Sequence, residues 1–98
     1  MTARERLSDD AIDRALATLP GWERRDDAIS RTFEFPAFMD GIAFVQRVAE
    51  AAERADHHPD VDIRWRKVTC ALSTHDRGGV TELDVALARE IDGLANAR

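Results

Sequence analysis

The sequence predicts an α+β domain in which three helices pack on one face of a four-stranded antiparallel sheet. Apolar residues recur at helical spacing in three segments, and two other segments show strand-like alternation with a break inside each. The resulting order is α-β-β-α-β-β-α. The 98-residue chain contains no linker, repeat or low-complexity segment, so we expect a single domain over residues 1–98.

The first helix begins after Leu7. Ser8 can cap it, and the two carboxylates that follow lie at the positive end of the helix dipole. Leu7 and Ile12 have the spacing of a hydrophobic staple, and Pro20-Gly21 ends the region. The core-facing stripe of this helix consists of Ile12, Ala15, Leu16 and Leu19.

Residues 22–35 predict the first hairpin. Asp26-Asp27 is the candidate turn, although it lacks the glycine that would make the signal strong. One face of the second strand is apolar at alternate positions, Ile29, Phe33 and Phe35, with Arg31 interrupting the pattern.

Residues 36–56 predict the longest helix, and this helix carries two apolar stripes. Together they cover more surface than one packing face needs, so a second partner is expected. The simplest partner is the same helix of another copy, which predicts a homodimer or homotetramer through helix 36–56. Phe44→Asp should then weaken assembly more than the sheet. The alternative is a helix buried unusually deeply in its own core. The stripes are Phe38, Ile42, Val45, Val48 or Ala49, Ala52, and Phe44, Val48, Ala51, Ala55.

Residues 61–74 predict two strands, because the apolar phase flips within the segment. A one-residue slip turns every side chain over, so we expect a bulge or turn at Arg66-Lys67. Trp65 has the parity of the core and is expected to pack there rather than against a ligand. His75 has the opposite parity from Leu72, and should lie on the less covered face or at the end of the strand. The two apolar sets are Val61, Ile63 and Trp65, and then Val68, Cys70 and Leu72.

The last helix follows Thr81-Glu82-Leu83-Asp84, which has the form of a capping box. Its apolar stripe consists of Leu83, Leu87, Ile91 and Leu94.

Composition excludes several classes of function. A net charge of −5 and a pI near 5.1 argue against a nucleic-acid binder, which concentrates Lys and Arg. No apolar run approaches the ~20 residues of a membrane span, and residues 1–6 lack the apolar segment of a signal peptide. The single cysteine cannot form an internal disulfide and is compatible with a reducing compartment. We therefore expect a cytoplasmic protein without nucleic-acid or membrane partners.

The three histidines of the chain fall within 19 residues, which suggests a site for proton transfer near neutral pH. Glu53 precedes His57-His58-Pro59, and His75 follows Trp65 by ten residues. This pattern resembles the signature of the pterin-4a-carbinolamine dehydratase family over about residues 7–92. Further matching segments are Gly21-Trp22, Phe33-Glu34-Phe35, Phe38 to Glu53, Leu72-Ser73-Thr74-His75, Gly78-Gly79-Val80-Thr81 and Asp84.

The resemblance implies a hydro-lyase that dehydrates a 4a-hydroxytetrahydropterin, such as 4a-hydroxytetrahydrobiopterin, to the quinonoid dihydropterin. The substrate forms when a pterin-dependent aromatic amino-acid hydroxylase turns over, so a functional link to such an enzyme is expected. No cofactor is needed. The alternative is a non-catalytic dimerisation or transcriptional coactivator module, because family members can act in that way. Retention of all three histidines favours catalysis.

The resemblance also implies the site residues. The catalytic residues are His57, His58 and His75, with the first and last as acids on opposite faces of the pterin and His58 in binding. Candidate substrate-binding residues are Glu53, Asp56, Thr74 and Asp84. A carboxylate among them could instead orient an imidazole, and Asp84 could simply cap its own helix. By its position, Glu53 could favour the charged form of His57.

Two other interpretations of the site residues are open. A zinc site built from the histidines and an aspartate is the rival chemistry, but consecutive histidines are poor partners for one ion, so we expect no metal. The two tryptophans, Trp22 and Trp65, could stack on a flat bicyclic ring.

Overall fold

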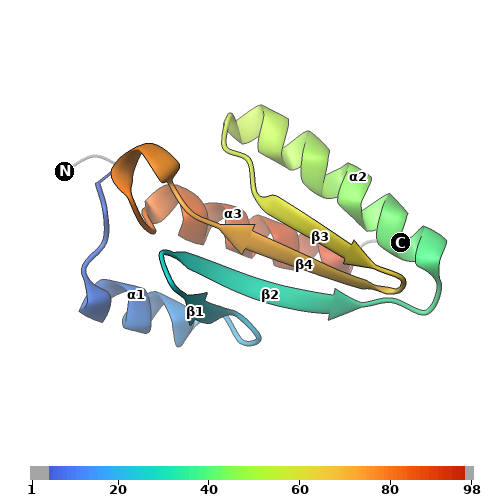
Figure 1. Cartoon of the computed structure of the whole chain (residues 1–98), viewed down its shortest axis with the longest axis horizontal. Helices are drawn as coiled ribbons and strands as arrows, with labels where there is room; N and C mark the ends of the chain where they lie inside the picture. Colours follow the sequence, from blue (N-terminus) through green and yellow to red (C-terminus); the bar gives the residue numbers. More distant parts are fainter. Residues whose placement is uncertain (1–4, 97–98) are drawn as a thin grey trace.

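The computed structural model describes residues 5–96, so the first four residues of the N-terminal segment discussed above lie outside it. It confirms the α+β class: the strands form one antiparallel sheet in the order β1-β2-β4-β3, and the helices lie on one of its faces (Figure 1). No helix within residues 5–96 is long and apolar enough to cross a membrane. The elements are α1 (Asp9–Leu16), β1 (Glu23–Arg25), β2 (Ala28–Glu34), α2 (Phe38–Ala55), β3 (Asp60–Arg64), β4 (Lys67–Leu72), the 3₁₀ turn η1 (His75–Arg77) and α3 (Glu82–Ala95).

The first hairpin confirms the predicted turn, and Asp26 adopts a left-handed conformation with φ of 54°. Arg31 interrupts the apolar face of β2 because it binds α3: its Nη1 donates to Asp92 Oδ1 over 2.8 Å, and its guanidinium lies over the ring of Phe33. Trp22 donates from Nε1 to the same carboxylate oxygen, also over 2.8 Å. The indole of Trp22 therefore packs in the core and is not available to stack on a ligand.

Helix α2 buries Phe44, Val48 and Ala51 of its second apolar stripe in the core of its own chain and leaves Ala55 exposed. The Phe44 side chain is 0% exposed, and its ring centroid lies 4.9 Å from that of Phe33 and 5.0 Å from that of Phe35. The expectation that Phe44→Asp would act mainly on assembly is therefore wrong, because the substitution would place a charge inside the monomer core. The large apolar side chains that α2 leaves exposed are those of Phe38 and Met39 in its first turn.

The expectation that Trp65 packs in the core is also wrong. Trp65 is 69% exposed and lies, with Arg66, in the two-residue turn between β3 and β4, one residue earlier than the turn predicted. Val61 and Ile63 do face the helix side, since they pair with the core residues Cys70 and Val68. However, β3 is the edge strand of the sheet and the helices do not cover it. The alternation of apolar residues therefore predicted on which side of the sheet these side chains lie, but it did not predict that they are exposed.

Candidate active site

The three histidines meet at one end of the sheet. Helix α2 stops at Ala55, where Asp56 takes a left-handed conformation with φ of 50°, and the two consecutive histidines link it to β3. His75 follows the end of the antiparallel neighbour β4, as predicted, so it returns to the end where β3 begins (Figure 1). Between these segments lies an open cleft of about 300 Å³, lined by Asp56, His57, His58, Ser73, Thr74, His75 and Asp76.

His57 forms the inner wall of this cleft and is only 9% exposed. Its Nε2 lies 2.5 Å from Oδ1 of Asp84, which is itself fully buried. An ionised carboxylate only accepts hydrogen bonds, so Nε2 must carry the hydrogen in this pair. The Nδ1 atom of His57 is then the ring nitrogen left for a substrate or water.

Asp84 is held by a chain of hydrogen bonds that begins at the N-terminus of α3. Its Oδ2 accepts from the backbone N–H of Thr81 over 2.8 Å and from Oγ1 of Thr74 over 2.9 Å. Because the Thr74 hydroxyl donates to Asp84, it must accept from the Thr81 hydroxyl, 2.7 Å away. Thr81 in turn accepts from the backbone N–H of Leu83. Every donor in this chain of hydrogen bonds therefore points toward the carboxylate, which fixes the orientation of Asp84.

This network confirms the predicted capping box of Thr81 and Asp84, and it joins the box to His57. Asp84 and Thr74 have almost no exposed surface, at 0% and 1%. Their placement therefore favours the alternative in which a carboxylate orients an imidazole over direct contact with a substrate.

His58 and Glu53 form a second, exposed pair at the rim of the cleft. Nε2 of His58 lies 2.6 Å from Oε2 of Glu53. The expectation that Glu53 would act on His57 is wrong, because the left-handed turn at Asp56 leaves His57 bonded to Asp84 instead. Glu53 and Asp56 are both exposed, and Asp56 lines the cleft.

His75 lines the cleft from a different element, the 3₁₀ turn η1, and is exposed. The loop around it is closed by a bridge between Thr74 and Gly79, in which Thr74 N donates to Gly79 O over 2.9 Å. Gly78 ends the turn in the left-handed region with φ of 72°, which favours glycine. The site thus places one imidazole opposite the His57-His58 segment.

Sequence reasoning missed three residues of the site. Ser73 and Asp76 line the cleft because they flank Thr74-His75, and adjacency alone could have suggested them. Thr81 was assigned only to the helix cap, although it also supports Asp84.

Neither tryptophan lines the cleft, and Trp65 lies at the other end of β3. Within residues 5–96, no group of three or more His, Cys, Asp or Glu side chains is arranged to hold a metal ion.

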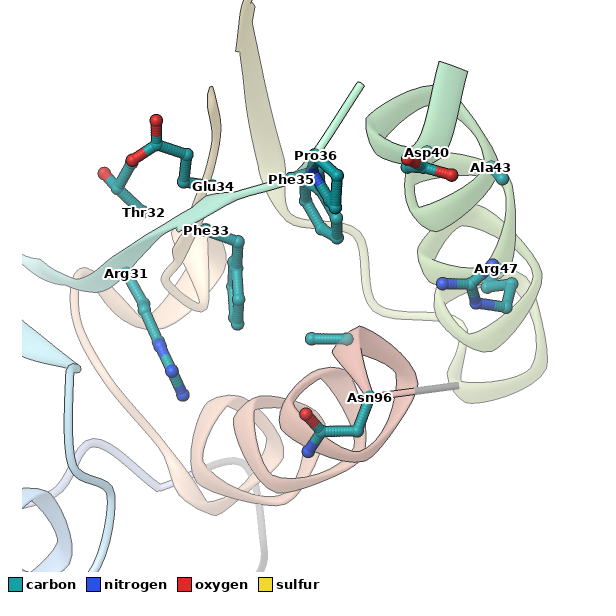
Figure 2. A pocket seen from close by; sticks show the side chains of 11 residues that line it. Arg31, Thr32, Phe33, Glu34, Phe35, Pro36, Asp40, Ala43, Arg47 and Asn96 are labelled. Atoms are coloured by element: carbon teal, nitrogen blue, oxygen red, sulfur yellow. The ribbon is translucent and has the colours of Figure 1, made fainter. Parts of the chain in front are cut away.

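A larger hollow of about 470 Å³ lies away from the histidines, between β2, the first half of α2 and the end of α3. Figure 2 shows Arg31 and Arg47 on its opposite walls, with Phe33 and Phe35 between β2 and the helices. Its lining mixes charged and aromatic groups but includes no histidine, so it does not suit the same proton-transfer chemistry.

Fold and site together define an α+β protein with a buried Asp–His pair, an exposed Glu–His pair and a third histidine around one cleft. Residues 5–94 match the family model described as pterin 4 alpha carbinolamine dehydratase. The chain belongs to this family.

Proteins similar to this chain carry related names. One from Mycobacterium sp. (strain KMS), with the provisional name pterin-4-alpha-carbinolamine dehydratase, is 62% identical over 88 residues, which are 90% of this chain and 94% of the relative. A relative from Mycobacterium avium (strain 104) with the same name is 57% identical over 93% of this chain and 97% of its own. A crystal structure of a transcriptional coactivator/pterin dehydratase from Brucella melitensis has a TM-score of 0.90 at 37% identity, covering 94% of this chain and all of that one.

Proposed function

We propose that this protein dehydrates a 4a-hydroxytetrahydropterin to the quinonoid dihydropterin by acid–base catalysis with its histidines, in the recycling of tetrahydropterin. The observation that carries the proposal is the cleft itself. Three imidazoles from two separate segments border one space of about 300 Å³, and one of them is held from behind by a buried carboxylate.

The chemistry balances without a cofactor. The C4a–O bond breaks, the oxygen leaves as water after it takes a proton, and N5 loses its proton as the C4a=N5 double bond forms. Hydroxide is a poor leaving group, so a proton donor at the oxygen lowers the barrier, and a second group must receive the N5 proton. Positioned acid and base groups typically contribute ~10²–10⁴-fold each.

His57 suits the role of acid because the Asp84 carboxylate holds the inner side of its ring at Nε2 and leaves Nδ1 for the substrate. With Nε2–H bonded to the carboxylate, a second proton on Nδ1 makes an imidazolium whose charge lies beside a buried anion. Giving up the Nδ1 proton leaves a neutral ring still bonded to Asp84. The ring therefore needs no reorientation during the reaction.

His75 and His58 complete the proposed site. His75 approaches from η1 and is the candidate for the second proton transfer, on the opposite face of the pterin. His58, paired with Glu53, is assigned to binding and orientation. Glu53 and Asp56 at the rim are the candidates for contact with the amino-pyrimidinone edge, while Thr74 and Asp84 act from behind His57.

The wider assignments belong to the same proposal. Residues 1–98 form one domain of this family, supported by a single sheet and a match over residues 5–94. A functional link to an aromatic amino-acid hydroxylase follows from the substrate, and a cytoplasmic location is consistent with a single, unpaired cysteine. Homodimer or homotetramer formation through helix 36–56 is retained as a prediction, for which exposed Phe38 and Met39 are the support.

The proposal is tested with His57→Ala and His75→Ala, which remove the two groups proposed to transfer protons. A hydroxylase generates the carbinolamine in situ, and its loss is followed after subtraction of the spontaneous rate. We expect each variant to lose about 10²-fold or more in kcat. Gln46→Ala, exposed on α2 outside the cleft, is the matched control and should keep the normal rate. Normal rates in both histidine variants, with native circular dichroism, would exclude these two histidines from the proton transfers.

A further inference from the structure

The three histidines of the proposed site differ in how their side chains are held. Nε2 of His57 contacts Asp84, and Nε2 of His58 contacts Glu53. Among the residues that the structure describes, none forms a hydrogen bond or an ion pair with the His75 side chain. His75 is exposed and lies in the three-residue turn η1. The place of its imidazole therefore depends on the backbone of the loop that carries it.

This loop, residues 74–80, is closed at its base by backbone hydrogen bonds. Thr74 and Gly79 form an antiparallel bridge, and the N–H of Thr74 donates to the carbonyl of Gly79 over 2.9 Å. The next residue, Val80, is buried, and its carbonyl accepts a hydrogen bond of 2.8 Å from the N–H of Leu7. Leu7 therefore binds the loop directly beside the bridge that closes it.

Arg6 and Leu7 reach the loop from outside the cleft. The cleft is lined by residues 56–58 and 73–76, whereas Arg6 and Leu7 border a separate hollow of about 400 Å³ together with Gly78 and Gly79. Figure 1 shows this segment, in blue, beside the orange loop that joins β4 to α3. A Cβ atom at Gly79 would lie 2.8 Å from Cδ and 3.1 Å from Cγ of Arg6. The stem of Arg6 therefore packs closely against the backbone of Gly79.

Helix α1 and the core anchor Leu7 itself. Ser8, which follows it, is the N-cap of α1, and its side chain accepts from the N–H of Ala11 over 3.1 Å. The Leu7 side chain packs against the core cluster that contains Ile12 and Val80. Because Leu7 is fixed from both sides, its N–H has a defined position toward the loop.

We propose that Leu7 and Arg6 are positioning residues for His75. Their contacts with Val80 and Gly79 fix the loop from outside the cleft, so that the imidazole keeps the place from which it transfers a proton. This role rests on the proposed function, in which His75 exchanges a proton with the pterin. Precise placement matters because a displacement of about 1 Å in a reacting group can cost about 10²-fold in rate.

Leu7→Pro and Leu7→Ala test the hydrogen bond to Val80. Both substitutions remove the leucine side chain, but only proline lacks the backbone N–H. Leu7→Pro should lower kcat for carbinolamine loss by about tenfold or more relative to Leu7→Ala. KM should stay within about threefold, because the candidate binding residues lie on α2 and the connection to β3.

A His75→Ala background separates positioning from general damage to the fold. Once the imidazole is absent, Leu7 has no group to position, so Leu7→Pro and Leu7→Ala should then give the same kcat within about twofold. A substitution that only destabilises the protein would lower kcat in either background.

Gly79→Ala tests the contact with Arg6 without the use of proline. The new methyl group displaces the Arg6 stem, and kcat should fall by about threefold or more. Gly93→Ala makes the same change on α3, where nothing lies within 4 Å of the new Cβ. It is the matched control and should keep the normal kcat.

Amide hydrogen exchange tests the loop without the reaction. The N–H of Thr74 that is bonded to Gly79 should exchange about tenfold faster in Leu7→Pro than in Leu7→Ala. If the unaltered protein does not dehydrate the pterin, the proposed function fails, and the exchange rates still decide whether Leu7 fixes the loop.

Three results would overturn the proposal. They are equal kcat values for Leu7→Pro and Leu7→Ala, a difference between them that persists in the His75→Ala background, and equal exchange of the Thr74 amide in the two variants. Circular dichroism melting checks that each variant folds. If Leu7→Pro does not fold, equal kcat values for Gly79→Ala and Gly93→Ala would overturn the proposal instead.

Discussion

Asp84→Asn changes one atom at the centre of the proposed site. In the native protein, Oδ2 of Asp84 accepts two hydrogen bonds from Thr74 and Thr81, and Oδ1 faces Nε2 of His57. An asparagine that keeps its oxygen toward the threonines turns its NH₂ group toward His57. The ring must then accept at Nε2 and carry its hydrogen on Nδ1. A second proton on this ring would meet a donor instead of an anion.

The size of the effect follows from the bonds involved. The substitution exchanges a charge-assisted hydrogen bond in a fully buried position for a neutral one, which costs about 1–3 kcal/mol of stability. For a chain of this size, each kcal/mol corresponds to roughly 4–8 °C in melting temperature, so we expect a loss of about 5–20 °C. Since a proton placed on His57 would no longer lie beside a carboxylate, kcat should fall by about 10²-fold or more.

The assay combines carbinolamine loss with thermal melting and with ¹⁵N NMR of the histidine rings. Imidazole nitrogen shifts report which nitrogen is protonated, so His57 should change from the Nε2–H to the Nδ1–H form. Thr74→Ser keeps the hydroxyl that donates to Asp84 and serves as the control, with activity near normal. A folded Asp84→Asn protein with native kcat and an unchanged His57 tautomer would refute the reasoning.

Two other predictions concern the core. Phe44→Asp should abolish folding of the monomer rather than only its association. Truncating a buried phenylalanine alone costs about 3–5 kcal/mol of stability, and a buried charge adds to that cost. Circular dichroism tests this prediction, and a folded monomeric variant would contradict it. Burial raises the pKa of the Cys70 thiol to about 12, so a thiol reagent at pH 8 should label the folded protein slowly and the denatured protein at once. The pKa of the thiol in the unfolded chain lies near 9.0, so ionisation of this group lowers the stability of the fold as the pH rises from 9.0 toward 12. Rapid labelling of the folded chain would contradict the burial of Cys70.

The element order could be predicted because local periodicity reflects burial within each helix and strand. Periodicity does not predict whether another element packs over the apolar face of a helix or strand. Val61, Ile63 and Trp65 have the pattern of a core strand, yet they lie at an edge that α2 leaves open. In the same way, the two stripes of helix 36–56 did not reveal that Phe44 meets Phe33 and Phe35 of its own chain.

The sequence predicted that the three histidines lie together, but not which carboxylate each imidazole contacts. Spacing brought the histidines together, but the bond between His57 and Asp84 joins residues 27 apart in sequence and depends on how α3 packs. The pairing of Glu53 with His58 depends on the left-handed backbone conformation of Asp56. Aspartate tolerates this conformation, but its presence in the sequence does not predict it. Long-range packing and one unusual torsion therefore decide which carboxylate serves which imidazole.

We propose that the imidazoles of this chain carry out the dehydration by proton transfer. The most direct measurement is the loss of a pterin carbinolamine in the presence of the unaltered protein, before and after exhaustive chelation. A rate that exceeds the spontaneous one, rises in proportion to protein and survives chelation is the predicted result. A rate no greater than the spontaneous one, or activity lost with EDTA and restored by one particular metal, would contradict it.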